Sequence, residues 1–249
     1  MNTYFTESII LKHKDFREAD RILNIYSKNY GKLDVIARGS RKIKSKLAGS
    51  LEPFCLVNLN LAKGKSFDTV ISSEIIINYN GIKSNLLKYA IANYCAEIID
   101  NLTKPYHRDL KIYKWLNDFF QILDRLSKIE NNKSSLVWFF IWNFLSLLGY
   151  QPNLYKCAYC KKEIGPKGNL FSFPYGGVAC GSCDKGDNEI VISEDVIKVL
   201  RIILRNDYKK LLLIKISQHL AKEISKITDL FLKYHLERDL NSRKFLAII

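Results

Sequence analysis

The sequence predicts a multidomain α+β fold, in which a small N-terminal β-barrel precedes an all-α helical domain that carries an inserted four-cysteine hairpin. Through the first eighty residues, apolar and polar side chains alternate with the period of a β-strand. From about residue 84 the apolar side chains recur every three to four residues, which is the period of an α-helix. Two closely spaced cysteine pairs interrupt the helical pattern. We therefore expect domains at residues 1–80 and 81–249, with the cysteine module at 153–190.

Five stretches of the first domain have the alternation of strands. They are residues 8–12, 21–27, 32–38, 54–62 and 67–78. Turn-forming sequences at residues 29–31 and 63–66 predict hairpins between the second and third strands and between the fourth and fifth. Five strands in a basic domain of this size are typical of an oligonucleotide-binding (OB) barrel. An SH3-like barrel is also compatible with the pattern.

The connection between the third and fourth strands, residues 38–51, is rich in cations and has no acidic residue before Glu52. A basic run is often only a solvated loop, but loops between OB strands contact nucleic-acid backbone, which favours a binding role here. Arg21 and Lys32, on the neighbouring strands, are expected to take part as well. The predicted phosphate contacts are Arg21, Lys32, Arg38, Arg41, Lys42, Lys44 and Lys46.

Three aromatic residues of the barrel, Tyr26, Tyr30 and Phe54, are candidates for stacking on bases, although strand aromatics commonly belong to the core. The chain has a formal charge of +14, which favours a polyanionic partner, and nucleic acid above all. No apolar run reaches the roughly 18 residues of a membrane-spanning helix. We therefore expect a cytoplasmic protein with no membrane contact.

Five helices are expected in the second domain. Apolar stripes that begin at Leu87 and Leu110 mark the first two. The third, at residues 137–148, is apolar nearly all round and should be central to the bundle. After the cysteine module, Ser193 can cap a fourth helix, and a fifth should run over residues 216–239.

The cysteines form the pattern C-x2-C, nineteen residues, C-x2-C, through Cys157, Cys160, Cys180 and Cys183. Two tight turns that each present a pair of thiolates supply the four ligands of a tetrahedral Zn²⁺ site. A redox-active C-x-x-C pair normally occurs singly, so two pairs at this spacing argue against a redox role. Structural disulfides are typical of secreted proteins, and this sequence shows no signal peptide. Because four thiolates leave no open position for a substrate, one structural Zn²⁺ per chain is expected.

The sequence lacks the motifs of nucleotide-binding and hydrolytic sites, namely the phosphate-binding glycine loops, H-E-x-x-H and G-x-S-x-G. Its four histidines, at positions 13, 107, 219 and 235, have neither metal-ligand nor catalytic spacing. We therefore expect a binding protein and not an enzyme.

Taken in order, several short motifs make the chain resemble the RecO family of bacterial recombination mediators. The motifs are ADRIL at 19–23, GKL at 31–33, ARG at 37–39 with Arg41, LAGSLEPF at 47–54, LGYQP at 148–152, the glycine pair at 176–177 and LNSRKFL at 240–246. The resemblance implies an OB domain, a helical domain with a zinc module, and binding of single- and double-stranded DNA. It further implies strand annealing and work with RecR to load RecA on gaps covered by single-stranded-DNA-binding protein, in the bacterial cytoplasm at the nucleoid.

Other classes stay open on the residues alone. A zinc-containing OB-fold RNA-binding factor would use the same barrel and the same cations, and a nucleic-acid hydrolase is a third possibility.

Overall fold

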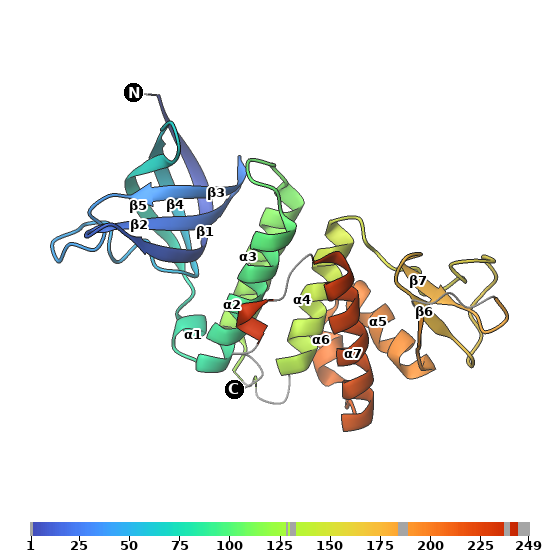
Figure 1. Cartoon of the computed structure of the whole chain (residues 1–249). Coiled ribbons are helices and arrows are strands. Elements are labelled where there is room, and N and C mark those ends of the chain that lie inside the picture. Colours follow the sequence, from blue (N-terminus) through green and yellow to red (C-terminus); the bar gives the residue numbers. More distant parts are fainter. Residues whose placement is uncertain (1, 128, 130–132, 184–188, 237–239, 244–249) are drawn as a thin grey trace. The chain divides into compact units, whose positions relative to one another are not determined.

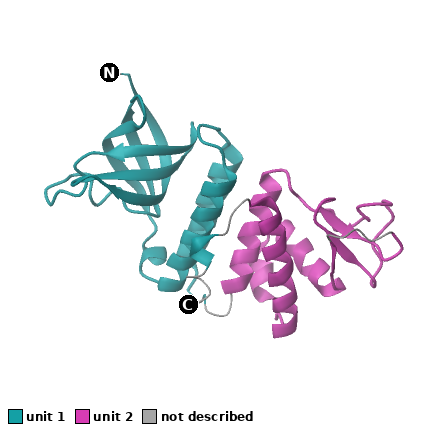
Figure 2. Cartoon of the chain, in the orientation of Figure 1, with its two compact units in different colours: residues 1–129, 240–249 teal, residues 130–239 magenta. Residues whose placement is uncertain are grey.

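The computed structural model describes residues 2–127, 129, 133–183, 189–236 and 240–243. It consists of two compact units, unit 1 at residues 1–129 and 240–249 and unit 2 at residues 130–239 (Figure 2). The chain therefore leaves unit 1, builds unit 2 and returns. The barrel strands end where the sequence predicts, near residue 80, whereas the compact division of the chain falls some fifty residues later.

The five strands of unit 1 form a closed barrel in the order β1-β2-β3-β5-β4 (Figure 1). The strands are β1 (Thr3–Phe16), β2 (Asp20–Ser27), β3 (Gly31–Ala37), β4 (Cys55–Ala62) and β5 (Asp68–Asn78). β1 pairs with both β2 and β4 and bends at an irregularity between Ile10 and Lys12, while β3 and β5 close the barrel in parallel. This is the strand order of an OB barrel, as predicted. β1 extends beyond its predicted span, residues 8–12, at both ends. The sequence does not indicate the start of the strand because Phe5, an apolar residue, faces solvent and interrupts the expected alternation of buried apolar and exposed polar side chains.

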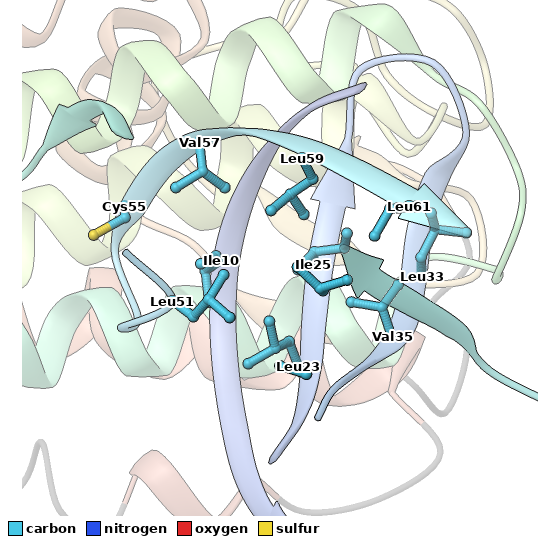
Figure 3. Packing of buried hydrophobic residues seen from close by; sticks show 12 residues of the cluster. Ile10, Leu23, Ile25, Leu33, Val35, Leu51, Cys55, Val57, Leu59 and Leu61 are labelled. Atoms are coloured by element: carbon cyan, nitrogen blue, oxygen red, sulfur yellow. The ribbon is translucent and has the colours of Figure 1, made fainter. Parts of the chain in front are cut away.

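Alternating residues of the five strands fill the barrel with aliphatic side chains (Figure 3). The buried cluster consists of Ile10, Leu23, Ile25, Leu33, Val35, Ala37, Leu51, Cys55, Val57, Leu59, Leu61 and Val70. Leu51 is the one member contributed by the basic connection, so the end of that loop is tied to the barrel interior.

Three helices follow the barrel within unit 1: α1 (Asn80–Lys83), α2 (Leu86–Leu102) and α3 (Leu110–Arg125). Phe54 has a left-handed backbone (φ 59°) and packs edge-on against Tyr89 of α2 and Phe120 of α3, with ring centroids 5.2 and 5.5 Å away. Phe54 and Tyr26 are fully buried, so their candidacy as base-stacking residues was wrong. Tyr30 is half-buried and packs edge-on against Tyr4.

The loop between α2 and α3 lies against the start of β3. Gly31 has φ +69°, and a Cβ at this position would come within 2.0 Å of the carbonyl oxygen of His107. The N–H of Tyr106 donates to the carbonyl of Lys32 at 3.0 Å. Only glycine satisfies both the turn conformation and this close approach.

Unit 2 contains four helices and a three-stranded sheet among its described residues. These are α4 (Lys133–Leu147), β6 (Leu170–Ser172), β7 (Gly177–Ala179), β8 (Glu189–Val191), α5 (Glu194–Leu204), α6 (Tyr208–Leu213) and α7 (Gln218–His235). The helix at α6 and the strand at β8 were not expected, because six and three residues are too few to show a period. The predicted end of the last helix at Asp239 lies outside the described residues.

Helix α4 is buried on nearly every side, as its composition predicts. Trp142 stacks on Phe231 of α7 with a centroid distance of 4.6 Å and an interplanar angle of 11°. Its indole N–H donates to the hydroxyl of Thr228 at 2.9 Å, so the polar atom of this buried ring is satisfied. Within the described part of the chain, no helix is both long enough and apolar enough to span a membrane.

Candidate metal centre and nucleic-acid interface

The four cysteines of the module converge on one point. Their sulfur atoms all lie within 4.8 Å of one another. The pairs Cys157–Cys183 and Cys160–Cys180 are 3.7 Å apart, and Cys180–Cys183 are 3.5 Å apart. Four sulfurs at Zn–S bond lengths of about 2.3 Å in a tetrahedron would be separated by about 3.8 Å. The spacing therefore fits a tetrahedral cation site.

Two backbone turns present the sulfurs. In the first turn the N–H of Lys161 donates to the carbonyl of Cys157 at 3.0 Å, and Lys161 itself adopts φ 63°. In the second the N–H of Cys183 donates to the carbonyl of Cys180 at 3.2 Å. The N–H of Ala158 donates to the carbonyl of Val178 at 2.8 Å and joins the two arms. Local hydrogen bonds thus assemble the site that the spacing predicts.

The thiols of the cluster ionise unequally. Burial opposes ionisation of Cys157, but backbone N–H groups, led by that of Cys180, outweigh it and lower the pKa of Cys157 to about 6. The hydrogen bond with Cys180, then desolvation, raises the pKa of Cys183 to about 12. Thiolates this close repel one another, so a cation is needed for all four to ionise together.

The module is anchored by its own small sheet. β6 pairs with β7, as the predicted hairpin requires, and also with β8 on its other edge. Phe171 of β6 packs against Trp142 of α4 and Phe231 of α7 at 5.9 and 5.5 Å. Through this ring the module joins the core of unit 2.

The basic connection, residues 38–51, lies beside the turn between β1 and β2. The N–H of Arg41 donates to the carbonyl of Ala19 at 3.0 Å, and the N–H of Gly39 donates to a carboxylate oxygen of Asp20 at 2.8 Å. All five of its predicted phosphate contacts are exposed to solvent, and four of them, Arg38, Lys42, Lys44 and Lys46, have no carboxylate partner among the ion pairs of the described residues. These four side chains are available to a polyanion.

Arg21 and Arg41 are paired with carboxylates of the barrel. Arg21 contacts Glu52 at 2.8 Å and Asp15 at 3.5 Å, and its side chain is 20% exposed. Arg41 contacts Asp15 at 3.3 Å and donates to the carbonyl of Glu18 at 3.1 Å. Through these contacts both arginines connect the end of β1 to the segment between β3 and β4. The side chain of Arg41 is also exposed to solvent. Asp15 and Arg21 lie directly opposite each other on β1 and β2. This pairing could not be predicted, because the predicted first strand ended at residue 12.

Lys32 lies away from the other predicted contacts. Its side chain is 11% exposed, its ammonium group is 3.2 Å from a carboxylate oxygen of Asp100 on α2, and it also donates to the carbonyl of that residue. This burial contradicts a role in phosphate binding, because the group that would meet DNA already holds a helix against the barrel.

One further cation of unit 1 adjoins the connection and was not among the predicted contacts. Arg17 is exposed at the turn between β1 and β2, and its carbonyl accepts a hydrogen bond from the guanidinium of Arg41 at 3.4 Å. Arg17 lies over the ring of Phe16 at 5.2 Å. A hairpin predicted from residue 16 to residue 20 would have placed Arg17 beside the connection.

Both parts of the chain match models of one protein family. The model described as Recombination protein O N terminal matches residues 1–79, and the model described as Recombination protein O C terminal matches residues 83–244. The DNA repair protein RecO of Thermoanaerobacter sp. (strain X514) is 31% identical over 244 residues, which cover 97% of this chain and 96% of that protein. The DNA repair protein RecO of Dehalococcoides mccartyi is 32% identical over 234 residues, or 94% of this chain and 91% of that protein.

These matches cover the barrel, the helices and the cysteine module in one continuous arrangement. They confirm the resemblance that the short motifs predict, although residues 244–246 of the last motif lie outside the described residues. The chain belongs to the recombination protein O family.

Proposed function

We propose that this protein binds single- and double-stranded DNA and acts in DNA repair and recombination as a mediator that anneals complementary strands. The observation that supports this most directly is the set of exposed cations on the connection between β3 and β4 of an OB barrel. Side chains of this kind neutralise phosphates without reading sequence, which leaves base edges free to pair. The names of the two relatives, both DNA repair protein RecO, agree with this assignment.

The cation of the cysteine module is proposed to be Zn²⁺ in a structural role. Four sulfur ligands at tetrahedral spacing favour zinc over harder cations, which prefer oxygen. With all four positions taken by cysteine, the metal has no place for a substrate. It would stabilise the sheet of the module and, through Phe171, its attachment to α4 and α7.

The wider role proposed for the protein follows from family membership. It would work with RecR to load RecA on gaps covered by single-stranded-DNA-binding protein, in the cytoplasm. Holding two DNA molecules close together needs charge on an accessible surface and no bond-breaking chemistry. We therefore expect annealing without hydrolysis of ATP.

An annealing assay tests the proposal. Two complementary labelled DNA strands should pair faster with the full-length protein than alone, without ATP and with Mg²⁺ present, and gel electrophoresis should show both strands at their original length. Matched RNA strands serve as the comparison. Equal or better annealing of RNA would favour an RNA-binding factor instead, and cleaved strands would favour a hydrolase.

A further inference from the structure

We propose that Ile43 is a wedge that enters a base step of double-stranded DNA held by the basic connection. The inference rests on the proposed DNA binding and adds to it a distortion of the duplex. Ile43 is fully exposed, with a relative accessibility of 104%, the highest among the exposed large apolar residues of the described chain. Single exposed apolar residues are ordinary on protein surfaces, so its surroundings decide the matter.

The backbone holds Ile43 in a hydrogen-bonded turn of the connection. The N–H of Lys42 donates to the carbonyl of Gly39 at 3.1 Å, and the N–H of Ser45 donates to the carbonyl of Lys42 at 2.9 Å. Ile43 therefore lies at the second position of a closed turn. Before this turn, the contact of Arg41 with the carbonyl of Ala19 anchors the chain to the β1–β2 turn.

The limb after the turn is anchored as well. Leu47 packs against the barrel core and Leu51 is completely buried within it. The hydroxyl groups of Ser50 and Ser73 of β5 are hydrogen-bonded to each other. Of the three large aliphatic residues of the connection, only Ile43 points to solvent, while both ends of the loop are fixed to the barrel.

A lysine precedes Ile43 in the sequence and another follows it. These two residues, Lys42 and Lys44, are both exposed. An aliphatic side chain between phosphate-binding cations is the composition of the wedges with which duplex-bending proteins unstack a base step from the minor groove. Contact between the bases and Ile43 would offset part of the cost of unstacking, and the lysines would hold the backbones on either side.

The test uses the full-length protein and a duplex with 2-aminopurine at a central TA step, because this base fluoresces more when it is unstacked. Wild-type protein should raise the fluorescence several-fold on binding. Ile43→Ser should abolish the rise and weaken duplex binding about three- to tenfold, the loss expected for one partly offset apolar contact. Affinity for a single strand and the salt dependence of binding should stay within about twofold of wild type, since the phosphate contacts remain.

Two variants make the result specific. Leu213→Ser on α6 replaces a similarly exposed aliphatic residue (83% exposed) and should behave as wild type. Ile43→Phe keeps an apolar tip and should retain the fluorescence rise. The inference fails if wild-type protein binds the duplex without a rise, or if Ile43→Ser weakens single-strand and duplex binding equally. Absence of any DNA binding by wild-type protein would refute the proposed function itself.

Discussion

Asp100 on α2 is a residue at which three polar side chains of the barrel meet. Its carboxylate accepts hydrogen bonds from Lys12 and from the amide of Asn24, the latter at 3.1 Å, and forms an ion pair with Lys32 at 3.2 Å. Burial opposes ionisation of Asp100, but the two ammonium groups outweigh it and lower the pKa of the carboxyl. The charged form of Asp100 therefore stabilises the packing of α2 on β1, β2 and β3.

Asp100→Asn should lower the free energy of unfolding by about 2–3 kcal/mol at pH 7, because it leaves the poorly exposed Lys32 without its counter-charge. Urea unfolding followed by circular dichroism measures the change. Asp118→Asn, an exposed carboxylate on α3 of the same unit, is the matched control and should cost less than about 0.5 kcal/mol. Equal effects of the two substitutions would contradict a special role for Asp100.

At this scale the sequence predicts which residues carry charge but not which charges are already paired. Lys32 reads as one more cation of a basic barrel, whereas its partner lies on a helix 68 residues further along the chain. The burial of Phe54 could not be predicted for a similar reason, since the rings that cover it, Tyr89 and Phe120, lie on helices with a different sequence pattern. The four cysteines were predictable because the spacing within each pair determines its own geometry.

At the scale of elements, the cysteine module offers a direct measurement. Protein prepared without chelators should contain close to one equivalent of zinc, and Cys160→Ser should lose most of it and lower the melting temperature. Cys55→Ser is the matched control, because Cys55 lies in the barrel and not in the cluster. Full zinc content in Cys160→Ser, or none in the wild type with four free thiols, would overturn the assignment.

The basic connection makes a second prediction at this scale. Replacing Arg38, Lys42, Lys44 and Lys46 with Ala should flatten the slope of log affinity against log salt for single-stranded DNA by about 3, since each phosphate contact contributes about 0.7. The loss should be alike for all sequences.

The control for this variant removes the same charge elsewhere in unit 1. Lys104, Arg108, Lys111 and Lys114 are exposed on and before α3, and their replacement with Ala should change the slope by less than about 1. If both variants flatten the slope equally, net charge and not the connection governs binding.

Most elements were predictable from period alone, and the exceptions are short or hidden. Helix α6 has only six residues, and β8 has three. Strand β1 extends to Phe16 because its second half pairs with β2, which a pattern read along one segment cannot reveal. Barrel closure through β3 and β5 depends on pairing between distant segments as well.

At the scale of the whole molecule, unit 1 includes a segment from the far end of the sequence. Glu97 of α2 accepts hydrogen bonds from the N–H groups of Asn241 and Ser242 at 3.0 and 2.8 Å, and from the hydroxyl of Ser242. Burial raises the pKa of Glu97, but these hydrogen bonds and the charge of Lys12 outweigh it, so the net shift is downward. Residues 241–243 are helical, and Glu97 caps them from outside their own segment.

Glu97→Gln should lower the free energy of unfolding by about 1 kcal/mol at pH 7, as does the loss of a helix cap, and should speed hydrogen exchange in residues 240–243. Because the folded-state pKa is lowered, this stabilisation is fully present above the ordinary value of 4.5 and disappears as the pH falls through the lowered pKa. The difference between wild type and variant should therefore vanish in acid. A constant difference down to pH 2 would contradict the assignment, and Glu163→Gln, an exposed residue of unit 2, is the control.

The division into units was not visible as a change of period. The period changes near residue 80, where the strands end, but α1 to α3 share a compact unit with the barrel. Contacts such as that of Phe54 with Tyr89 and Phe120 join them, and such contacts depend on three-dimensional packing and not on periodicity.

The return of the chain to unit 1 sets an order of events during synthesis. The barrel and α1 to α3 leave the ribosome first, and Glu97 then has no Ser242 to cap until the whole of unit 2 has been made. Closing a loop of 110 residues costs only a few kcal/mol of chain entropy. The hydrogen bonds from residues 241 and 242 to Glu97 therefore form only after the rest of unit 1 has been made. In a nascent chain arrested before residue 240, the carboxylate of Glu97 on α2 would still lack these partners.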